Sequence, residues 1–393
     1  MLAMFNKVSI VKLISRFQTG KTPPSKETKY FDGDVNWFTP SDIGLTKYLA
    51  NSSRKITQLA IDENKAYLYP KGSMLLTCIG EIGRIGIIKS DSSSNQQITA
   101  LLPNENVETE YLYYWFIHNK HVLQHLSNNA VVPILNNAQL KKLQIPLPPL
   151  PVQQKIAAIL DAADAYRQKT KALIEKYDQL AQSLFLEMFG DPVKNEKGWE
   201  VTTIRNVVRE VKYGTSAKAG DTGSFPYLRM NNITYEGYMD YSDLKYIDVR
   251  DEEKPKFSVK RGDILFNRTN SKDLVGKTGL ITTDSEMIIA GYLIRVRVNT
   301  DMNPYFVWGH LNSNWAKLIL KNMCKNIIGM ANINAQELQE IKILKPPRDI
   351  QDLFAKCIDK LFDQKTILSK NLEKTNQLFQ SLLQKAFNGD LVS

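Results

Sequence analysis

The sequence contains few cysteines and no long apolar run. Its three cysteines, Cys78, Cys324 and Cys357, lie far apart and form no Cys-x-x-Cys pair. This pattern argues against a disulfide framework and against a cysteine-based zinc site, and it fits a reducing compartment. No segment reaches the length of a membrane-spanning helix, and residues 1–17 lack the apolar centre of a signal peptide. We therefore expect a soluble, cytoplasmic protein without membrane contact.

Motifs of common enzyme classes are missing as well. Residues 20–22 and 276–278 both read Gly-Lys-Thr, but Ser15 and Ser271 occupy the positions where a phosphate-binding loop needs its first glycine. There is no Gly-x-Ser-x-Gly, no Gly-x-Gly-x-x-Gly after a predicted strand, and no Asn-Pro-Pro-aromatic segment of the kind that amino-methylating enzymes carry. Three histidines share one face of a predicted helix without a nearby cysteine or acidic ligand: His118, His121 and His125. The sequence therefore predicts no catalytic residue, metal site or cofactor in this chain.

The chain repeats itself with a period of about half its length. Pro148-Pro149 precedes the segment 152–191, Pro346-Pro347 precedes the segment 350–390, and the same offset aligns Gln153 with Gln351. Weaker matches lie upstream of these segments: residues 71–76 with 261–266, and residues 83–86 with 276–279. The repeat predicts four segments: a globular domain over 1–147, a helix over 148–191, a second domain over 192–345 and a second helix over 346–393.

Both repeated segments have the features of long helices. Each follows a Pro-Pro pair, which favours a sharp helix start, and ends at a glycine, Gly190 or Gly389. Heptad spacing in the first predicts an apolar seam of Ile156, Ile159, Ala163, Tyr166, Thr170, Leu173, Tyr177, Leu180 and Leu184. The second seam, interrupted by Lys365, comprises Phe354, Ile358, Leu361, Leu368, Leu372, Thr375, Phe379, Leu382 and Ala386. We expect the two helices to pair as an antiparallel coiled coil; the alternative is that each packs on its own domain.

The two globular segments carry the excess of positive charge. The chain has a net charge of +10, while residues 152–191 hold five basic and six acidic residues and residues 350–390 hold six and five. A basic surface favours a polyanionic partner such as nucleic acid. Short apolar runs at 73–79, 84–89, 263–266 and 293–298 predict strands, and 110–127 and 304–323 predict helices. We expect two small α/β domains with twisted sheets.

Several polar segments of these domains are candidates for DNA contact. Arg, Asn and Gln form bidentate hydrogen bonds with base edges, and Lys, Ser and Thr more often contact phosphates. The first-domain candidates are Lys21, Thr22, Lys26, Trp37, Thr39, Ser41, Arg84 and Gln96. Those of the second domain are Thr215, Ser216, Arg229, Asn231, Asn267, Arg268, Thr269, Asn270 and Lys272. The run 267–272 is the most suggestive, although a solvated polar loop explains it equally well.

These features together resemble the specificity subunit of type I restriction-modification systems. The resemblance covers the whole chain and rests on the alternation of domains and helices, on the Pro-Pro-x-x-x-Gln segments at 148–153 and 346–351, and on the Phe-Gly-Asp and Phe-Asn-Gly-Asp ends at 189–191 and 387–390. The turn Gly20-Lys21-Thr22-Pro23 is similar to the family's Gly-x-Thr-Pro turn, whereas residues 214–217 lack the proline.

The resemblance implies a division of labour between subunits. Each domain would recognise one half of a bipartite target in double-stranded DNA, and the helices would fix the gap between the halves and dock two methyltransferase subunits. Those subunits would bind S-adenosylmethionine; whether two ATP- and Mg²⁺-dependent restriction (translocase) subunits join them stays open. The alternatives are a stand-alone sequence-specific DNA-binding regulator, a nuclease of unrecognised type and a purely structural coiled-coil protein.

Overall fold

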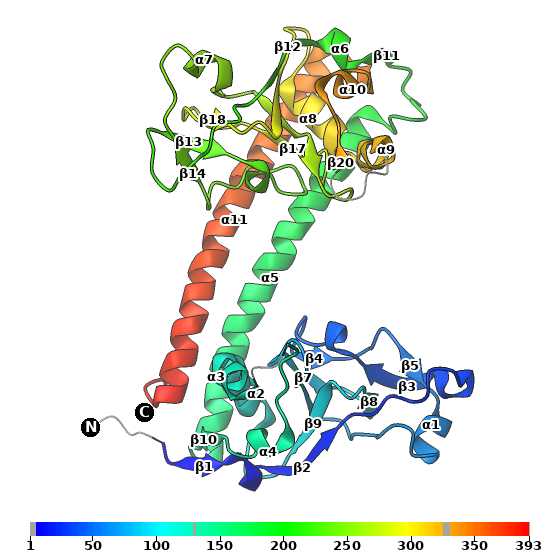
Figure 1. Ribbon diagram of the computed structural model, residues 1–393, viewed down its shortest axis with the longest axis vertical. Coiled ribbons are helices and arrows are strands. Elements are labelled where there is room, and N and C mark those ends of the chain that lie inside the picture. Colours follow the sequence, from blue (N-terminus) through cyan, green and yellow to red (C-terminus); the bar gives the residue numbers. More distant parts are fainter. Residues whose placement is uncertain (1–4, 129–130, 325–330, 393) are drawn as a thin grey trace. The chain divides into compact units, whose positions relative to one another are not determined.

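The computed structural model describes residues 5–128, 131–324 and 331–392. The chain divides into two compact units, one formed by the residues up to Thr170 together with those from Asn371, the other by Lys171–Lys370. Each unit contains one of the predicted globular domains and a section of both long helices, α5 (Leu150–Phe189) and α11 (Arg348–Asn388) (Figure 1). The helices therefore do not form a separate module, because each contributes to the core of both units.

Unit 1 is built on a mainly antiparallel five-stranded sheet in the order β2-β9-β6-β7-β4. These strands are β2 (Ile14–Thr19), β9 (Ile98–Pro103), β6 (Met74–Thr77), β7 (Ile85–Ile88) and β4 (Tyr48–Leu49). A second sheet has the order β5 (Lys55–Ile56), β3 (Phe31–Phe38) and β8 (Ser92–Ser94), and β1 (Lys7–Ser9) pairs with β10 (Gln144–Pro146). The short helices are η1 (Ile10–Lys12), η2 (Thr28–Tyr30), η3 (Pro40–Asp42), α1 (Gln58–Asp62), α2 (Thr109–His118), α3 (Lys120–Leu126) and α4 (Asn137–Leu140).

Unit 2 has a four-stranded antiparallel sheet in the order β12-β19-β15-β17. These strands are β12 (Val208–Tyr213), β19 (Leu293–Val298), β15 (Ile264–Asn267) and β17 (Thr278–Leu280). The smaller sheets are β14 (Lys245–Ile247), β13 (Phe225–Leu228) and β18 (Ile288–Ile289); β11 (Glu200–Thr203) with β21 (Lys342–Lys345); and β16 (Thr269–Asn270) with β20 (Ala331–Asn332). The short helices are α6 (Ile204–Val207), η4 (Met230–Asn232), α7 (Lys254–Phe257), α8 (Pro304–Asn312), α9 (Asn314–Met323) and α10 (Ala335–Gln339).

The strand orders confirm the internal repeat. The order β2-β9-β6-β7 in unit 1 matches β12-β19-β15-β17 in unit 2, and β5-β3-β8 matches β14-β13-β18. The matching sequence segments 71–76 and 261–266 lead into β6 and β15, and the segments 83–86 and 276–279 lead into β7 and β17. The predicted mixture of helix and sheet is therefore confirmed, in two copies of one topology.

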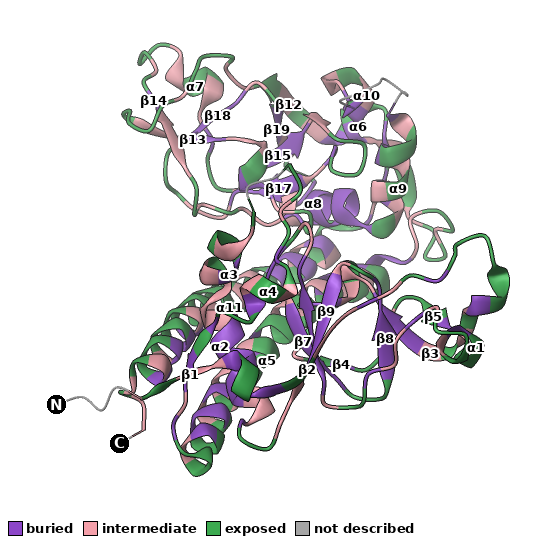
Figure 2. Ribbon diagram, turned by 60° about the horizontal axis from the view of Figure 1, so that its bottom comes forward, coloured by how far each residue is buried: buried purple, intermediate pink, exposed green. Residues whose placement is uncertain are grey.

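Each unit has a core with the same three layers. In unit 1, Met74 and Leu101 of the sheet pack under Tyr111 of α2, which in turn meets α5 and α11. In unit 2, Ile264 and Ile294 of the sheet pack under α8, against the same two helices. Figure 2 shows the buried colour concentrated on the central strands and on α2 and α8. The helix pair is therefore part of each hydrophobic core rather than a bare spacer.

Both long helices begin and end where the sequence predicts. The glycines that follow them adopt the left-handed conformation, with φ of 81° at Gly190 and 89° at Gly389, which an L side chain would strain. Within unit 1 the first half of α5 contacts the last part of α11, and within unit 2 the second half of α5 contacts the first part of α11. This pairing confirms the antiparallel arrangement. Both alternatives hold, since the helices pack on each other and on the domains.

The interruption of the α11 seam at Lys365 has a partner. The Lys365 ammonium pairs with the carboxylate of Asp178 on α5 and lies over the ring of Tyr238, 3.3 Å from its centroid. Burial lowers the pKa of Lys365, because a desolvated ammonium is costly. Any other alignment of the two helices would bury one of these charges without its partner, so the pair favours the observed alignment.

The predicted seam of α5 is confirmed at Ile156 and Thr170, which are buried, and is one residue off at its alternate positions. Tyr166, Leu173 and Leu180 are 56%, 39% and 50% exposed, while Ala181 and Phe185 are buried. A heptad seam alternates steps of three and four residues, and at these positions the larger apolar side chains favoured the wrong step. The correct register contains Arg167, whose guanidinium lies over the ring of Phe379 at 4.3 Å from its centroid and pairs with Asp164 at 2.8 Å.

The two predicted domain helices are each divided in two. The expected helix over 110–127 breaks at Asn119 into α2 and α3, and the expected helix over 304–323 breaks at Ser313 into α8 and α9. His118 therefore ends one helix while His121 and His125 belong to the next, so the three histidines do not share a helix face. The ring of His118 stacks on Phe387, 5.5 Å between centroids.

Among the helices of the described residues, none combines the length and apolar character that crossing a bilayer requires.

Candidate nucleic-acid interface

A cleft of about 840 Å³ lies in unit 2 where the loops after β12, β13, β15 and β18 meet. Six of the nine candidates predicted for the second domain line it: Thr215, Ser216, Arg229, Asn231, Arg268 and Thr269. Lys218, Lys245 and the tyrosines Tyr227 and Tyr292 complete the lining. The fold therefore gathers residues from 215 to 332 into one basic and aromatic surface, of a composition that suits nucleic acid.

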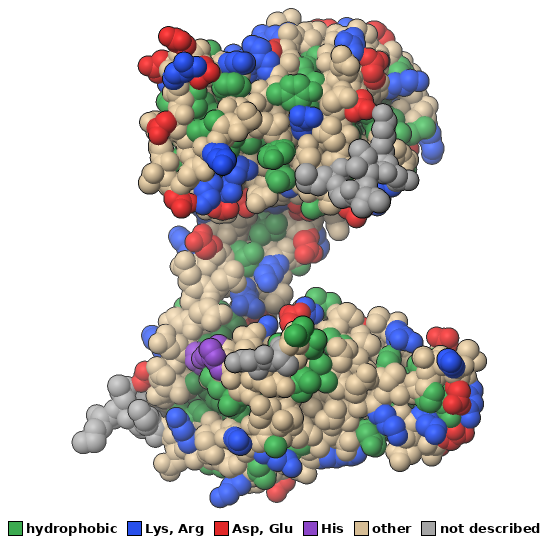
Figure 3. All heavy atoms as spheres, viewed as in Figure 1, with side chains coloured by type: hydrophobic (Ala, Val, Ile, Leu, Met, Phe, Trp, Pro, Cys, Tyr) green, Lys and Arg blue, Asp and Glu red, His purple; other side chains and the backbone are tan. Residues whose placement is uncertain are grey.

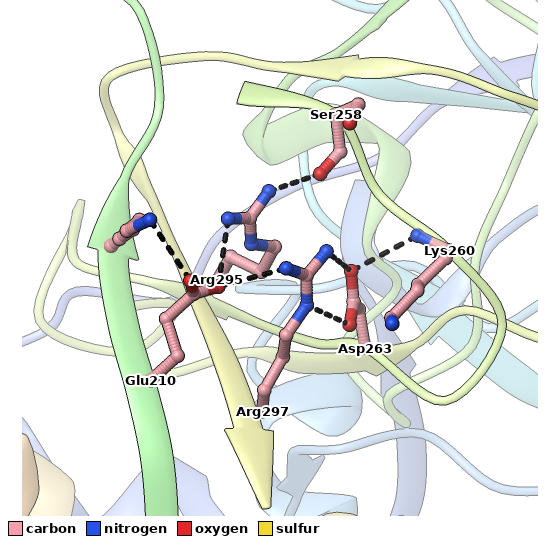
Figure 4. A network of polar contacts seen from close by, with 7 residues as sticks. Glu210, Ser258, Lys260, Asp263, Arg295 and Arg297 are labelled. Atoms are coloured by element: carbon pink, nitrogen blue, oxygen red, sulfur yellow. Dashed lines mark hydrogen bonds and ion pairs between the residues drawn. The ribbon is translucent and has the colours of Figure 1, made fainter. Parts of the chain in front are cut away.

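The strands that support these loops are tied by a network of ion pairs (Figure 4). Arg295 and Arg297 on β19 bind Glu210 on β12, at 2.8 and 3.0 Å, and Arg297 also binds Asp263 at the start of β15. Burial alone would raise the pKa of Glu210, but Lys212 and the two arginines outweigh it and lower the pKa to about 2. The alternating sequence of β19 predicts one solvated face, yet Arg295 is fully buried, where the carbonyl of Ser258 and the carboxylate of Glu210 replace water at its two terminal nitrogens.

Arg268 is held firmly at the wall of the cleft. Its backbone N–H donates to Tyr292 O at 3.0 Å, and its carbonyl accepts from Ile333 N at 2.9 Å. Its guanidinium lies over the ring of Tyr213, 4.8 Å from the centroid, and Tyr213 Oη accepts from Ala335 N at 2.9 Å. Among the described residues no hydrogen-bond partner of this guanidinium is found, and its Nε is shielded from solvent.

Arg229 lines the same cleft but is partly neutralised. One terminal nitrogen of its guanidinium donates to the carboxylate of Asp243 at 2.9 Å and to the carbonyl of that residue at 3.0 Å. Its backbone N–H donates to Asn232 Oδ1 at 2.8 Å, which caps η4. Asn231, beside it, is exposed and directed to the cleft.

The remaining candidates of the second domain take other positions. Asn267 is the last residue of β15 and fully buried, so it does not belong to an exposed loop as the sequence suggests. Thr269 and Asn270 form the short strand β16, where Thr269 Oγ1 donates to Asn332 Oδ1 at 3.0 Å. Lys272 is exposed and lies outside the cleft lining. The polar run 267–272 is therefore a strand end followed by a second strand, and two of its six residues reach the cleft.

In unit 1 the turn after β2 brings four of the predicted residues together. Thr22 Oγ1 donates to Gln96 Oε1, and both side chains are exposed. Lys21 N donates to Ser94 O at 3.0 Å, and its carbonyl accepts from Trp37 Nε1 at 3.3 Å. Trp37 is 3% exposed, so its indole supports this turn from below instead of offering a face to a base.

Glycine is required at the start of this turn in both units. A Cβ on Gly20 would collide with the carbonyl oxygens of Ser94 and Asn95, and a Cβ on Gly214 with those of Ile289 and Ala290. Unit 2 lacks the proline that follows this turn in unit 1. The close packing of backbone against Gly214 is nevertheless the same as that against Gly20.

Arg84 makes contacts within unit 1 that the sequence did not predict. Its guanidinium donates to the carbonyls of Pro40 and Ile43 at 3.3 and 3.5 Å and pairs with Glu81. The equivalent residue in unit 2, Lys277, donates to Met230 O at 2.9 Å and to Ile233 O, and burial lowers its pKa. Both cations hold the segment that contains η3 or η4, so the guanidinium of Arg84 is engaged within the fold, and its contact with DNA stays a prediction.

The other first-domain candidates are Thr39 and Ser41, at η3, and Lys26, between β2 and η2. Thr39 is the N-cap residue of η3. Its N–H donates to Asp42 Oδ2 at 2.8 Å, and its hydroxyl lies 2.9 Å from Ser41 Oγ. Ser41 and Lys26 are exposed. One residue that the motif search missed is Arg54, which is exposed and lies over the rings of Trp37 and Phe31 at 5.1 and 5.3 Å. In the sequence, the two basic residues Arg54 and Lys55 that follow two serines could have marked this segment as a candidate for DNA contact.

Surface charge alone does not mark the interface. Figure 3 shows Lys and Arg side chains scattered over the visible face of each unit among acidic and apolar ones. The cleft of unit 2 and the β2 turn of unit 1 are instead distinguished by the convergence of several loops.

The sequence matches the family described as the type I restriction modification DNA specificity domain, over residues 7–176 and again over 196–378. The two matched regions cover most of the chain and correspond to its two repeats. The chain belongs to this specificity family.

Relatives with the same description align over much or nearly all of the chain. The MjaIX specificity subunit of Methanocaldococcus jannaschii is 25% identical over 98% of this chain and 93% of its own length. The EcoKI specificity subunit of Escherichia coli is 26% identical over 68% of this chain and 62% of its own length. Both relatives are named as specificity subunits of type I restriction enzymes, which agrees with the family match.

Solved structures confirm the fold. The S subunit from M. genitalium superposes with a TM-score of 0.57 at 16% identity, over 98% of this chain and 96% of the other. A chain from work on complex assembly and conformational transition of the type I system gives a TM-score of 0.55 at 16% identity, over 99% of both chains. The specificity-family fold thus extends over the whole of this protein.

Proposed function

We propose that each unit of this chain recognises one half of a bipartite DNA target, and that the chain delivers methyltransferase subunits to that target. The observation that carries the proposal is the unit 2 cleft, where six predicted contact residues from separate loops converge on one surface. Direct recognition needs such a surface, with donors for base edges and cations for phosphates. The β2 turn of unit 1, with Lys21, Thr22 and Gln96, is the corresponding candidate for the other half.

The chemistry belongs to partner subunits in this proposal. The chain contributes no catalytic group; S-adenosylmethionine binds to two methyltransferase subunits, and ATP and Mg²⁺ to two restriction subunits where these are present. The helix pair offers a docking surface, because Tyr166, Leu173 and Leu180 are exposed at intervals of seven residues and therefore lie on one face of α5. Exposed apolar side chains in such a row are typical of a surface that another helix covers.

The helices also provide the spacing between half-sites. At 1.5 Å per residue, the 40 residues of α5 give a continuous helix of about 60 Å. Half-sites on one face of B-DNA lie about 34–36 Å apart or at multiples of this distance, a range that a helix of this length can set.

The test is to map the methylation that the chain directs. The chain is expressed with a type I methyltransferase subunit of its own organism in a host that lacks adenine methylation, and modified bases are mapped by long-read sequencing. Methylated adenines in one split motif, with two short half-sites and a fixed gap, are the expected result. A stable complex without any split motif contradicts recognition by the two units, and tight specific binding by the isolated chain without a partner favours a stand-alone regulator.

A further inference from the structure

Among the described residues, Arg268 is the arginine of the unit 2 cleft that has no ion pair, and its backbone and ring contacts hold it in place. Lys245 pairs with Asp221, and Arg229 pairs with Asp243. The guanidinium of Arg268 has only the ring of Tyr213 against its face, with no hydrogen-bond partner among the described residues. An unpaired guanidinium with a shielded Nε is costly, so this arrangement indicates a ligand that completes it.

We propose that Arg268 recognises a guanine, so that the half-site of unit 2 contains a G·C pair at one fixed position. This inference rests on the proposed function and adds the identity of a base. A guanidinium presents a planar fork of N–H donors, and guanine presents the O6 and N7 acceptors in the major groove, a pairing that makes arginine the commonest specific reader of this base.

The surroundings of Arg268 fix the plane of this fork before DNA binds. The Tyr213 ring lies against the guanidinium, and Tyr213 is itself fixed by the hydrogen bond from Ala335 N to its hydroxyl. The backbone on both sides of Arg268 is tied to Tyr292 and Ile333. Because the side chain is already ordered, little conformational freedom is lost on binding, which favours a directional bidentate contact.

A guanine fits this position better than the two other obvious ligands. Adenine presents the donor N6–H₂ beside its acceptor N7, which the donor-only fork of Arg268 does not match; the exposed amide of Asn231 belongs to another loop of the cleft. A phosphate is served by any exposed cation, and Lys218 on the same cleft is exposed, whereas Nε of Arg268 is hidden from solvent. A recessed, oriented fork matches a base edge more closely than a phosphate group.

The experiment uses the complex with its methyltransferase subunit and compares the wild type with Arg268→Ala, Arg268→Lys and Arg54→Ala. Methylation motifs are mapped genome-wide, and binding to duplexes that differ from the target at single positions is measured by competition. We expect Arg268→Ala to reduce the preference for the G·C pair at one position of one half-site by about 10- to 100-fold. Arg268→Lys keeps the charge but lacks the fork, so the same position should relax.

Arg54→Ala is the matched control, because Arg54 is the stacked arginine of the other unit. It should leave the position governed by Arg268 unchanged, and unaltered thermal melting of each variant shows that it folds. If Arg268→Ala weakens binding equally for all sequences and Arg268→Lys restores it, Arg268 contacts a phosphate and the inference is wrong. A split motif that Arg268→Ala leaves intact, or that relaxes at an A·T pair, also overturns it. Absence of any split motif for the wild type overturns the proposed function itself.

Discussion

One glutamine at the start of each long helix joins that helix to the domain that precedes it, and the two glutamines are equivalent in the repeat. Gln153 accepts a hydrogen bond from Glu108 N at 2.8 Å and donates to Pro148 O at 2.9 Å. Gln351 accepts from Asn303 N at 2.7 Å and donates to Pro346 O at 2.8 Å. Both side chains are buried. The glutamine of the Pro-Pro-x-x-x-Gln segment therefore connects the start of the helix to the loop that precedes α2 or α8.

Replacement of this glutamine should destabilise the protein. Gln153→Ala leaves the N–H of Glu108 and the carbonyl of Pro148 without partners in a buried place, which costs about 1–3 kcal/mol. The free energy of unfolding, measured by urea denaturation, should fall by this amount. Gln154→Ala removes the neighbouring exposed side chain and serves as the control; equal losses for the two variants would contradict the structural role of Gln153.

Glu210 makes the stability of unit 2 dependent on pH. Its pKa in the folded protein is about 2, below the ordinary value of 4.5, so it contributes stability above about pH 4.5 that is lost as the pH falls toward 2. Glu210→Gln should reduce the free energy of unfolding by about 2–3 kcal/mol at neutral pH and flatten its pH dependence between about pH 5 and pH 3.

The control for Glu210 is Glu196→Gln, which removes the same charge from an exposed ion pair with Lys194. Surface pairs of this kind contribute about 0–1 kcal/mol, so the pH profile should stay close to that of the wild type. Parallel profiles for Glu210→Gln and the wild type would show that the network of Figure 4 does not lower the pKa of this carboxyl group.

Individual side-chain positions were the least predictable part of the site. Arg268, Arg229 and Thr215 were proposed as DNA contacts from residue type; they line one cleft, because polar and basic side chains in loops are seldom buried, and their contact with DNA stays a prediction. Trp37 and Asn267 were also proposed as contact residues from their type. Both are buried, because they belong to strands whose pairing partners lie far away in the sequence. Composition cannot distinguish a loop residue from the end of a buried strand.

At the level of elements, the long helices were predictable and their contact face was predictable only in part. Pro-Pro and Gly mark their ends through local backbone sterics, which act without the rest of the fold. The register depends on the partner helix: Arg167 enters the seam of α5 only because Phe379 of α11 offers an aromatic face. Two side chains that the prediction placed in the seam, Leu173 and Leu180, are exposed and form part of the proposed docking row.

A charge on this exposed row should weaken assembly without unfolding the chain. Leu173→Glu places a carboxylate on the proposed docking face, where its desolvation opposes binding. Co-purification with the methyltransferase subunit should fall by 10-fold or more, while thermal melting of the isolated chain stays nearly unchanged. Gln168→Glu adds the same charge on the other flank of the α5 seam and should have little effect; equal losses would place the docking face elsewhere.

At the level of the whole chain, the internal repeat was the most informative signal. It predicted two copies of one topology, which the matching strand orders confirm. The exact division was beyond the sequence, since the boundary between compact units falls inside both helices, after Thr170 and after Lys370. No composition change marks these positions, because a helix continues through each of them.

These two positions allow the spacing proposal to be tested directly. Insertion of one heptad after Thr170 and one after Lys370 lengthens each helix by about 10 Å and leaves the contacts within each unit in place. Seven residues are close to two full turns, so the helix faces stay nearly aligned. The methylated motif should keep both half-sites and gain about three base pairs in its gap, at 3.4 Å per base pair. An unchanged gap would show that the helices do not set it.

The contacts of Arg84 and Lys277 have a consequence for the history of such proteins. Both bind carbonyl oxygens of the segments around η3 and η4, a group that every amino acid carries. Mutations can therefore replace the side chains of these segments while the support beneath them persists. A lineage could exchange the bases that it recognises in a few substitutions, one half of the target at a time, and still inherit the same scaffold and the same partners.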